Sequence, residues 1–452
     1  METLNQRINF NEVVGKIKPM HAAGGGPRQG FAGGWDISNY FRSMNIPYTR
    51  LHDVEYPFGS GLFVDIHCVF PNFDADENDP ASYYFRSTDM YLQACVDVGC
   101  EPFYRLGESI DHTDNCLYIN PPKDYAKWAR ICEHIIRHYN EGWADGFHFG
   151  IKYWEIWNEP DSYLPDYNKI NMWTGTQQQY FDLYYVAATH LKKCFGDSIK
   201  IGGYSACNLN ALVDKEQSRR GQHLIKWAEA FLKFVKESGA PLDYFSYHRY
   251  FNDPKEMYEY NVNARKWLDE MGFPNAEAIL TEYNCGPIPT VDEKLSTKMG
   301  AELAYIFLSC QKTPVDMMMY YFFSRVSSAF SRVIGPNKEV YSSYYAFCMF
   351  GKLYALGNEV YSGGHDPESD VALVAAKNDK KGGIMLANVG VAPKELKLTL
   401  EGIEGYSRYT VYTLDTGMSP DIPTVCMQGD VQKDLTIKLD NRYCMMYIDF
   451  EA

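Results

Sequence analysis

Two hydrophobic patterns alternate along the first three quarters of the chain. Apolar runs of about five residues predict buried strands, and longer stretches with an apolar residue at every third or fourth position predict amphipathic helices. Each predicted strand is followed by a predicted helix, and this unit recurs eight times before about residue 356. The predicted strands span residues 17–21, 47–52, 102–106, 153–159, 199–203, 243–248, 278–282 and 315–323.

The helix after the fourth strand has a clear start signal. Thr176 and Gln179 are spaced as a capping box, in which each side chain bonds the other residue's backbone N–H. Apolar residues then recur at helical spacing and predict one stripe that faces the core: Tyr180, Leu183, Tyr184, Ala187, Leu191 and Cys194.

Eight strand–helix units predict an α/β fold, an expanded (β/α)8 TIM barrel over residues 17–356. A doubly wound open sheet would also alternate strands and helices. That fold usually has a glycine-rich phosphate turn after its first strand. The turn Gly24-Gly25-Gly26-Pro27 lacks the required spacing, so the barrel is favoured.

After residue 357 the pattern changes to short strands separated by Gly, Asp and Lys turns. This pattern predicts a C-terminal antiparallel β-sandwich domain over residues 357–452. Residues 1–16 carry one isolated alternating patch near residue 8, which we expect to join the sandwich and tie the two ends of the chain together. The predicted strands lie at residues 371–374, 383–386, 396–400, 409–412, 435–439 and 444–448.

Two glutamates stand at the ends of predicted strands. Pro160 cannot continue a sheet ladder, so Glu159 lies at the carboxyl end of the fourth strand, where such barrels place their chemistry. Glu282 ends the seventh strand, across the barrel mouth. Facing carboxylates suit glycoside hydrolysis, which in retaining enzymes needs a separation of about 5–5.5 Å. The alternative, a helix-cap acid and a surface acid, is less favoured because both residues occupy strand ends.

Composition narrows the classes of partner. The net charge of −15 argues against nucleic acid or an anionic membrane as a partner. No run of about 18 apolar residues occurs, so we expect no membrane span. Because the first residues have no apolar core of a signal peptide, we expect a cytoplasmic location. The sequence leaves a homo-oligomer open.

Several segments carry a family resemblance. The segment 154–161, together with Glu282, resembles the retaining glycoside hydrolases of clan A. The chain most resembles glycoside hydrolase family 39, the β-xylosidases and α-L-iduronidases. The similar segments cover most of the barrel in the family's order: residues 120–128, 158–160, 173–176, 180–184, 201–203 and 246–248.

This resemblance implies roles for individual residues. Glu159 would be the acid/base, Glu282 the nucleophile and Asn158 a donor to the sugar's 2-hydroxyl. Arg50 and His52 match the family's Arg-x-His, with His52 bonding a sugar hydroxyl; His248 and Tyr250 match a His-x-Tyr pair that flanks the nucleophile. A tyrosine hydroxyl on Glu282 would hold its orientation and keep it ionised.

The end of the eighth strand departs from the family pattern. Family xylosidases often have a tryptophan and acidic residues there, whereas this chain has Tyr320-Tyr321-Phe322-Phe323-Ser324-Arg325. A basic group near the sugar could pair bidentately with a uronic carboxylate, so Arg325 supports an iduronidase-like alternative. The interpretation we favour is that Arg325 pairs with a barrel acid such as Glu108.

The sequence therefore predicts a retaining exo-glycosidase, most like a β-xylosidase, that acts on an oligosaccharide or small glycoside and needs no cofactor and no metal. An α-L-arabinofuranosidase, α-L-iduronidase or β-galactosidase with the same carboxylate pair is the alternative. A non-catalytic sugar-binding barrel is the competing class.

Overall fold

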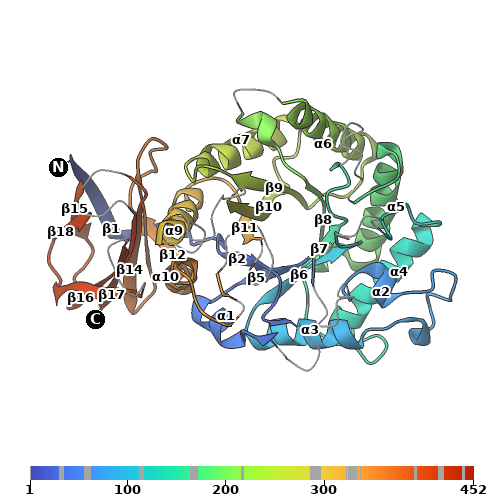
Figure 1. The fold of residues 1–452 in the computed structure, drawn as a ribbon, viewed down its shortest axis with the longest axis horizontal. Helices are drawn as coiled ribbons and strands as arrows, with labels where there is room; N and C mark the ends of the chain where they lie inside the picture. The colour runs from blue at the N-terminus through green and yellow to red at the C-terminus, as the bar shows by residue number, and fades with distance from the viewer. Residues whose placement is uncertain are drawn as a thin grey trace.

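The computed structural model shows a closed barrel ringed by helices, with a curled sheet against one side of it (Figure 1). Both chain ends lie in the curled sheet. The structure describes residues 2–29, 35–54, 63–110, 117–162, 172–214, 218–285, 297–321, 323, 333–335, 337–390, 394–415, 422–439 and 443–452.

Eight parallel strands close the barrel in the order β10-β11-β2-β5-β6-β7-β8-β9, which confirms the predicted (β/α)8 fold. Their neighbours follow chain order around the ring, as in other barrels of this type. The strands are β2 (Ala22–Gly24), β5 (Tyr48–Leu51), β6 (Glu101–Leu106), β7 (Tyr153–Ile156), β8 (Lys200–Ala206), β9 (Tyr244–Phe251), β10 (Glu277–Cys285) and β11 (Met317–Tyr320).

Helices surround the barrel and bury their apolar stripes against it. On α5 the predicted capping box is present: Thr176 Oγ1 accepts from the Gln179 amide at 3.2 Å, and Gln179 Oε1 accepts from the Thr176 amide at 2.8 Å. The helices are α1 (Ser38–Met44), α2 (Ile66–Val69), α3 (Arg86–Asp97), α4 (Tyr125–Asn140), α5 (Gln177–Phe195), α6 (Arg219–Ser238), α7 (Glu256–Glu270), α9 (Thr297–Gln311) and α10 (Ser342–Leu356).

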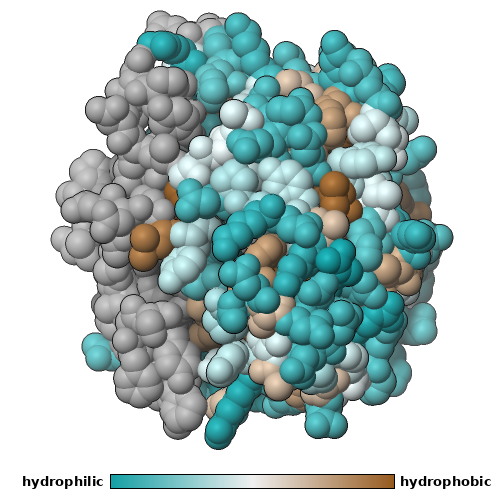
Figure 2. All heavy atoms as spheres, turned by 90° about the vertical axis from the view of Figure 1, so that its right-hand side faces the viewer, coloured by the Kyte–Doolittle hydropathy of each residue, from teal (hydrophilic) through white to brown (hydrophobic). Residues whose placement is uncertain are grey.

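The outer side of the helix ring at α4 and α5 is mainly hydrophilic. In the face that includes α4 and α5, apolar side chains are scattered among polar ones (Figure 2). None of the helices that the structure describes combines the length and the apolar character that crossing a membrane requires.

The first barrel strand forms later in the chain than predicted. The prediction of 17–21 was wrong, since β2 begins at Ala22. Pro19 has no amide hydrogen to give to a ladder; its carbonyl instead accepts from the Met318 amide at 3.2 Å. A Cβ at Gly24 would lie only 3.3 Å from the Tyr320 carbonyl, so the small residues allow close pairing with β11.

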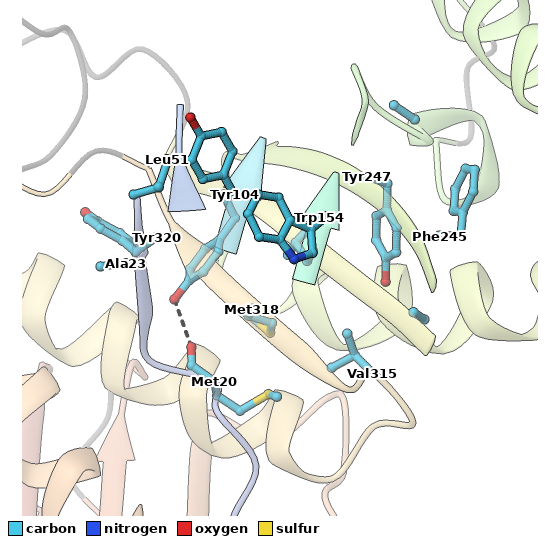
Figure 3. Close-up of a cluster of buried hydrophobic side chains, with 14 of the residues drawn as sticks. Met20, Ala23, Leu51, Tyr104, Trp154, Phe245, Tyr247, Val315, Met318 and Tyr320 are labelled. Carbon is cyan, nitrogen blue, oxygen red and sulfur yellow. Dashed lines mark hydrogen bonds between the residues drawn. The ribbon is translucent and has the colours of Figure 1, made fainter. Parts of the chain in front are cut away.

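Alternation along the strands separates the barrel interior from the surrounding core. One set of side chains packs inside the barrel: Ala22, Phe103, Tyr153, Tyr244, Ile279, Met317 and Met319. The other set, including Leu51, Tyr104, Trp154 and Tyr247, belongs to the larger core cluster between strands and helices (Figure 3). Because side chains alternate, Arg50 and Glu155 follow two residues after inward-facing aromatics and point to the upper interior.

The second body is a nine-stranded mixed sheet in the order β17-β16-β19-β14-β13-β12-β1-β15-β18, consistent with the predicted C-terminal β-sandwich. The strand β1 lies between β12 and β15 and joins the N-terminal segment to this sheet; it runs parallel to β15, a departure from the antiparallel pattern. The strands are β1 (Glu2–Lys16), β12 (Asn358–Tyr361), β13 (Val371–Lys377), β14 (Lys381–Asn388), β15 (Lys394–Glu401), β16 (Arg408–Asp415), β17 (Thr424–Asp430), β18 (Asp434–Leu439) and β19 (Cys444–Glu451).

The barrel contacts this sheet through its last two helices. Both α9 and α10 lie against β13, β14 and β19 (Figure 1). The helix α9 is correspondingly buried along its whole length. The exact domain limits at residues 16, 356 and 357 stay a prediction.

Candidate active site

The turn after β7 presents Glu159 at the barrel mouth. Trp157 and Glu159 both adopt left-handed backbone conformations, with φ of 73° and 43°. The turn is tied to the neighbouring strands, because the Trp157 amide donates to Leu106 at 2.7 Å and the Glu159 amide to Ser205 at 3.1 Å. Non-glycine residues adopt such conformations only where the surroundings impose them, and these often lie at functional sites.

Glu282 reaches the same space from β10. A register irregularity between Leu280 and Glu282 pairs Glu282 with His248 on β9. Glu282 and His248 are both buried, with 4% and 0% of their surface exposed. The bulge therefore brings these two side chains together at the mouth.

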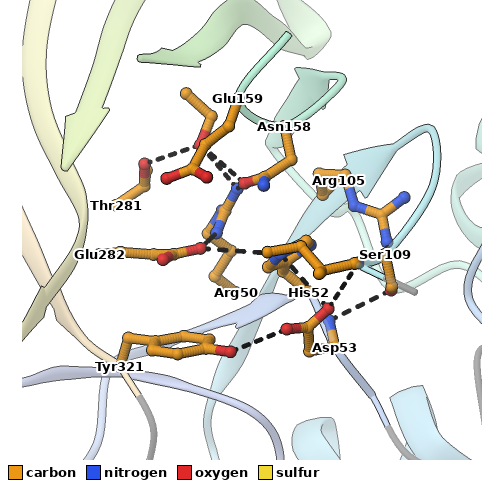
Figure 4. Close-up of polar contacts among 12 residues, drawn as sticks. Arg50, His52, Asp53, Arg105, Ser109, Asn158, Glu159, Thr281, Glu282 and Tyr321 are labelled. Atoms are coloured by element: carbon orange, nitrogen blue, oxygen red, sulfur yellow. Dashed lines mark hydrogen bonds and ion pairs between the residues drawn. The ribbon is translucent and has the colours of Figure 1, made fainter. Parts of the chain in front are cut away.

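Arg50 connects the residues at the mouth (Figure 4). Its Nη1 donates to Glu282 Oε1 at 2.6 Å, and its Nε donates to Glu155 Oε2 at 2.7 Å. Its Nη2 donates to Asn158 Oδ1 at 2.6 Å and to Ser205 Oγ at 2.8 Å. This guanidinium is 1% exposed, so it supplies a permanent positive charge to two buried carboxylates.

The two residues of the His-x-Tyr pair contact different glutamates. The Tyr250 hydroxyl donates to Glu282 Oε2 at 2.8 Å. His248 Nδ1 lies 2.7 Å from Glu159 Oε1 and 3.6 Å from Glu282 Oε2, so its closer contact is with Glu159. The sequence had placed His248 beside Glu282 alone.

His52 lies on the other side of Glu282. Its Nε2 is 3.8 Å from Glu282 Oε1 and 3.4 Å from Asp53 Oδ1. Asp53 accepts from the Tyr321 hydroxyl at 2.7 Å and from the Ile110 amide at 3.0 Å. These contacts tie the mouth to the ends of β6 and β11.

The two glutamates lie close enough to act on the same glycosidic bond. One carboxylate oxygen of Glu159, one of Glu282 and a ring nitrogen of His248 all lie within 4.8 Å of one another. This spacing suits a retaining glycosidase, whereas inverting enzymes separate their carboxyl groups by about 6.5–9.5 Å to admit a water.

The two carboxyl groups have different surroundings. Burial raises the pKa of Glu159 to about 7, although Arg220, Cys207 and Arg50 oppose this rise. Burial also raises the pKa of Glu282, but His248, Arg50 and the Tyr250 hydroxyl act against it. Because Glu282 bonds a guanidinium directly, we infer that it is the group that keeps its charge.

Three side chains of the site were not singled out from the sequence: Asp53, Glu155 and Ser205. Alternation could have found Glu155, which is inward-facing and two residues after Tyr153. Ser205 gave no such signal, because it lies in an irregular part of β8 with a φ of 59°.

Arg325 lies outside the described residues. The described partner of Glu108 is His67, not an arginine.

Histidine, cysteine and carboxylate groups gather at three places in the described part of the chain. At the mouth, Glu159 and Glu282 already accept bonds from His248, Tyr250 or Arg50, so a cation there would compete with the guanidinium. The other two groups have contacts of their own: Asp65, His67 and Glu108, and Glu133, His190 and Cys194.

Arg50→Met is expected to lower the free energy of unfolding by about 3–5 kcal/mol at pH 8, because it leaves Glu155 and Glu282 buried without a cation. The loss should shrink as the pH falls, since the stranded carboxylates then become protonated. Denaturant unfolding measures it. Arg7→Met is the control: its bridge to Glu401 is exposed and screened by solvent, so a much smaller loss is expected. Equal losses in the two variants would contradict the role of Arg50.

The barrel and its carboxylate pair define a class of protein, the glycoside hydrolases. The sequence model of Glycosyl hydrolases family 39 matches residues 7–279, more than half of the chain, and the chain belongs to this family.

Two β-xylosidases are similar in sequence. The one from Geobacillus stearothermophilus is 24% identical over 300 residues, 60% of this chain and 54% of that protein. The one from Caldicellulosiruptor saccharolyticus is 23% identical over 411 residues, 82% of this chain and 76% of that protein. The chain thus spans about half the length of the first relative.

Solved structures share the whole fold. A glucosidase from Croceicoccus marinus matches with a TM-score of 0.78 and 20% identity, over 100% of both chains. A monomeric β-xylosidase from Caulobacter crescentus matches with a TM-score of 0.70 and 16% identity, over 99% of both chains. At these identities the likeness concerns the fold, and it includes the sheet beside the barrel.

Proposed function

We propose that the protein is a retaining exo-glycosidase of the β-xylosidase type, which hydrolyses O-glycosidic bonds of an oligosaccharide or small glycoside. The observation that carries this proposal is the Glu159–Glu282 pair, in which one oxygen of each carboxylate lies within 4.8 Å of the other at the barrel mouth. The choice of xylose is supported by the names of the two sequence relatives.

In the first step, Glu282 attacks the anomeric carbon while Glu159 gives its proton to the leaving oxygen. The bond from the anomeric carbon to that oxygen breaks, and an ester between Glu282 and the sugar forms. The raised pKa of Glu159, about 7, keeps a proton available near neutral pH. The hydrogen bonds that Arg50 and Tyr250 donate to Glu282 favour its ionised form and fix the orientation of its carboxylate.

In the second step, Glu159 takes a proton from water as the water oxygen attacks the same carbon. The ester bond breaks and Glu282 returns as a carboxylate. Two inversions give net retention of the anomeric configuration. One residue serves both steps because it ends the first step deprotonated.

Asn158 is suited to bind the sugar. Its Oδ1 accepts from Arg50, which turns its amide nitrogen the other way. That nitrogen has no hydrogen-bond partner among the described residues, and it is buried. It is thus a donor available to the sugar's 2-hydroxyl. We assign His52 to another sugar hydroxyl, since it is placed beside Glu282 on the opposite side from His248.

A panel of 4-nitrophenyl glycosides tests the substrate. It should include xyloside, arabinofuranoside, galactoside, glucoside and uronide. The highest kcat/KM is expected for the β-xyloside. A preference for the arabinofuranoside, galactoside or uronide would show that this sugar is the substrate on which the same two glutamates act. Turnover of none of them would favour a non-catalytic sugar-binding barrel.

The rate should also depend on pH in a defined direction. Only protonated Glu159 can donate, so kcat/KM for a glycoside with a poor leaving group should fall as the pH rises through about 7. Above that point the loss should approach about tenfold per pH unit. Rates across pH 5–9 measure this, with Glu159→Ala as the control that should lack the descending limb. If the fall of kcat/KM at high pH persisted in Glu159→Ala, it would reflect the titration of another group.

A further inference from the structure

The His248 ring lies between two carboxyl groups on one side and a hydroxyl on the other. Its Nδ1 faces Glu159 Oε1 at 2.7 Å and Glu282 Oε2 at 3.6 Å. Its Nε2 lies 2.6 Å from the Ser205 hydroxyl oxygen. The ring is fully buried, so no bulk solvent competes for either nitrogen.

The proton of the neutral ring belongs on Nδ1. Burial lowers the pKa of His248 to about 4, and Arg50 also acts in this direction although Glu282 and Glu155 oppose it, so the ring carries one N–H near neutral pH. Nδ1 faces two carboxyl groups, of which Glu282 is ionised. A nitrogen lone pair there would be repelled, whereas an N–H is attracted by both groups.

Nε2 must then accept a hydrogen bond, and Ser205 is placed to donate it. The Ser205 oxygen accepts from Arg50 Nη2 at 2.8 Å, and a guanidinium cannot accept in return. The hydroxyl hydrogen is therefore free to turn elsewhere. His248 Nε2 at 2.6 Å is closer than Asn158 Oδ1 at 3.1 Å or Thr281 Oγ1 at 3.5 Å.

We propose that Ser205 is a positioning residue that fixes the Nδ1–H tautomer of His248, and through it places the transferable proton of Glu159 on Oε2. In this arrangement Nδ1–H donates to Glu159 Oε1, so the acid's own hydrogen can sit only on the other oxygen. With the opposite tautomer, Glu159 would donate its hydrogen to Nδ1 and could not offer it to a leaving group.

The backbone holds Ser205 in place for this role. Ser205 is fully buried, and its amide donates to Ser246 Oγ at 2.8 Å. Its carbonyl accepts from the Glu159 amide at 3.1 Å, so the same residue touches the acid through its backbone and the histidine through its side chain. Ser205 also has a left-handed φ of 59°.

Nitrogen NMR of ¹⁵N-histidine-labelled protein tests the tautomer without any substrate. The His248 signals are identified as those lost in His248→Gln. The proposal predicts a directly bonded hydrogen on Nδ1 and none on Nε2 at pH 7. A hydrogen on Nε2 would overturn it. Because this measurement does not involve turnover, it stands apart from the proposed glycosidase function.

Kinetics with a series of leaving groups test whether Ser205 affects proton donation by Glu159. This test rests on the proposed glycosidase function. Ser205→Ala should lower kcat/KM by about 10-fold or more for poor leaving groups, which need a proton, and only slightly for 2,4-dinitrophenolate, which does not. Ser205→Gly lacks the hydroxyl too and suits a positive φ, so it serves if the alanine variant folds poorly. Ser309→Ala, which removes a buried hydroxyl on α9, is the control and should match the wild type.

A loss of the same size for all leaving groups in Ser205→Ala and Ser205→Gly would overturn the proposal, since it would show damage to Glu282 or to the fold. Unchanged rates throughout would overturn it as well. If the wild-type protein turned over no glycoside, the proposed function would fail, and the NMR result would still decide the tautomer.

Discussion

Glu282→Ala is expected to lower kcat/KM for an activated aryl glycoside by roughly 10⁴-fold or more, because it removes the carboxylate that forms the bond to the anomeric carbon in the proposed mechanism. Activated leaving groups depart without acid assistance, so the loss isolates the nucleophile. Steady-state rates on the 2,4-dinitrophenyl glycoside measure it. The fold should survive, since Arg50 keeps its ion pair with Glu155.

Two checks make this result specific. Glu270→Ala, on the outer face of α7, removes an exposed glutamate and should leave kcat/KM unchanged. Azide added to Glu282→Ala should restore product formation, as a glycosyl azide of inverted configuration, because a small anion can enter the space of the lost carboxylate. Full activity of Glu282→Ala without azide would refute the role of Glu282.

Glu159→Ala is expected to lower kcat/KM by about 10²–10⁴-fold for poor leaving groups and far less for activated ones. With an activated glycoside the first step stays fast, but the second loses its base, so product should appear in a burst. Stopped-flow absorbance of the released phenolate measures the burst. The physical basis is the proton that burial retains on Glu159 near neutral pH.

Azide distinguishes the two glutamates. In Glu159→Ala it should attack the ester on Glu282 and give a glycosyl azide of retained configuration, opposite to the result in Glu282→Ala. Equal losses for good and poor leaving groups in Glu159→Ala would show that Glu159 is not the acid. Glu256→Ala is a suitable control, because it removes a partly exposed carboxylate that pairs with Arg249 and not with either of the two glutamates.

Much of the fold could be predicted from the sequence because its signals are local. Alternation, helical periodicity and the Thr176–Gln179 capping box each depend on residues near one another in the chain. The barrel followed from eight repeats of one pattern. The strands β12 and β17 gave no such signal: β12 has four residues, and β17 is exposed on most positions.

The acids could be predicted because each lies near the carboxyl end of a strand, but the contacts between them could not. The proximity of His248 to Glu159 depends on the left-handed turn at Trp157 and Glu159, and its pairing with Glu282 depends on a bulge in β10. Ser205 belongs to a second bulge, in β8. Such irregularities are set by packing between distant strands and leave no periodic trace.

Mass spectrometry of a trapped glycosyl-enzyme shows directly whether Glu282 forms a covalent bond to the sugar. The trap is the 2-deoxy-2-fluoro derivative of whichever activated glycoside is turned over fastest, since the fluorine slows breakdown of the ester. We expect the protein to gain the mass of one glycosyl unit, carried by the peptide that contains Glu282. An adduct on another residue, or turnover with inversion and no adduct, would contradict it.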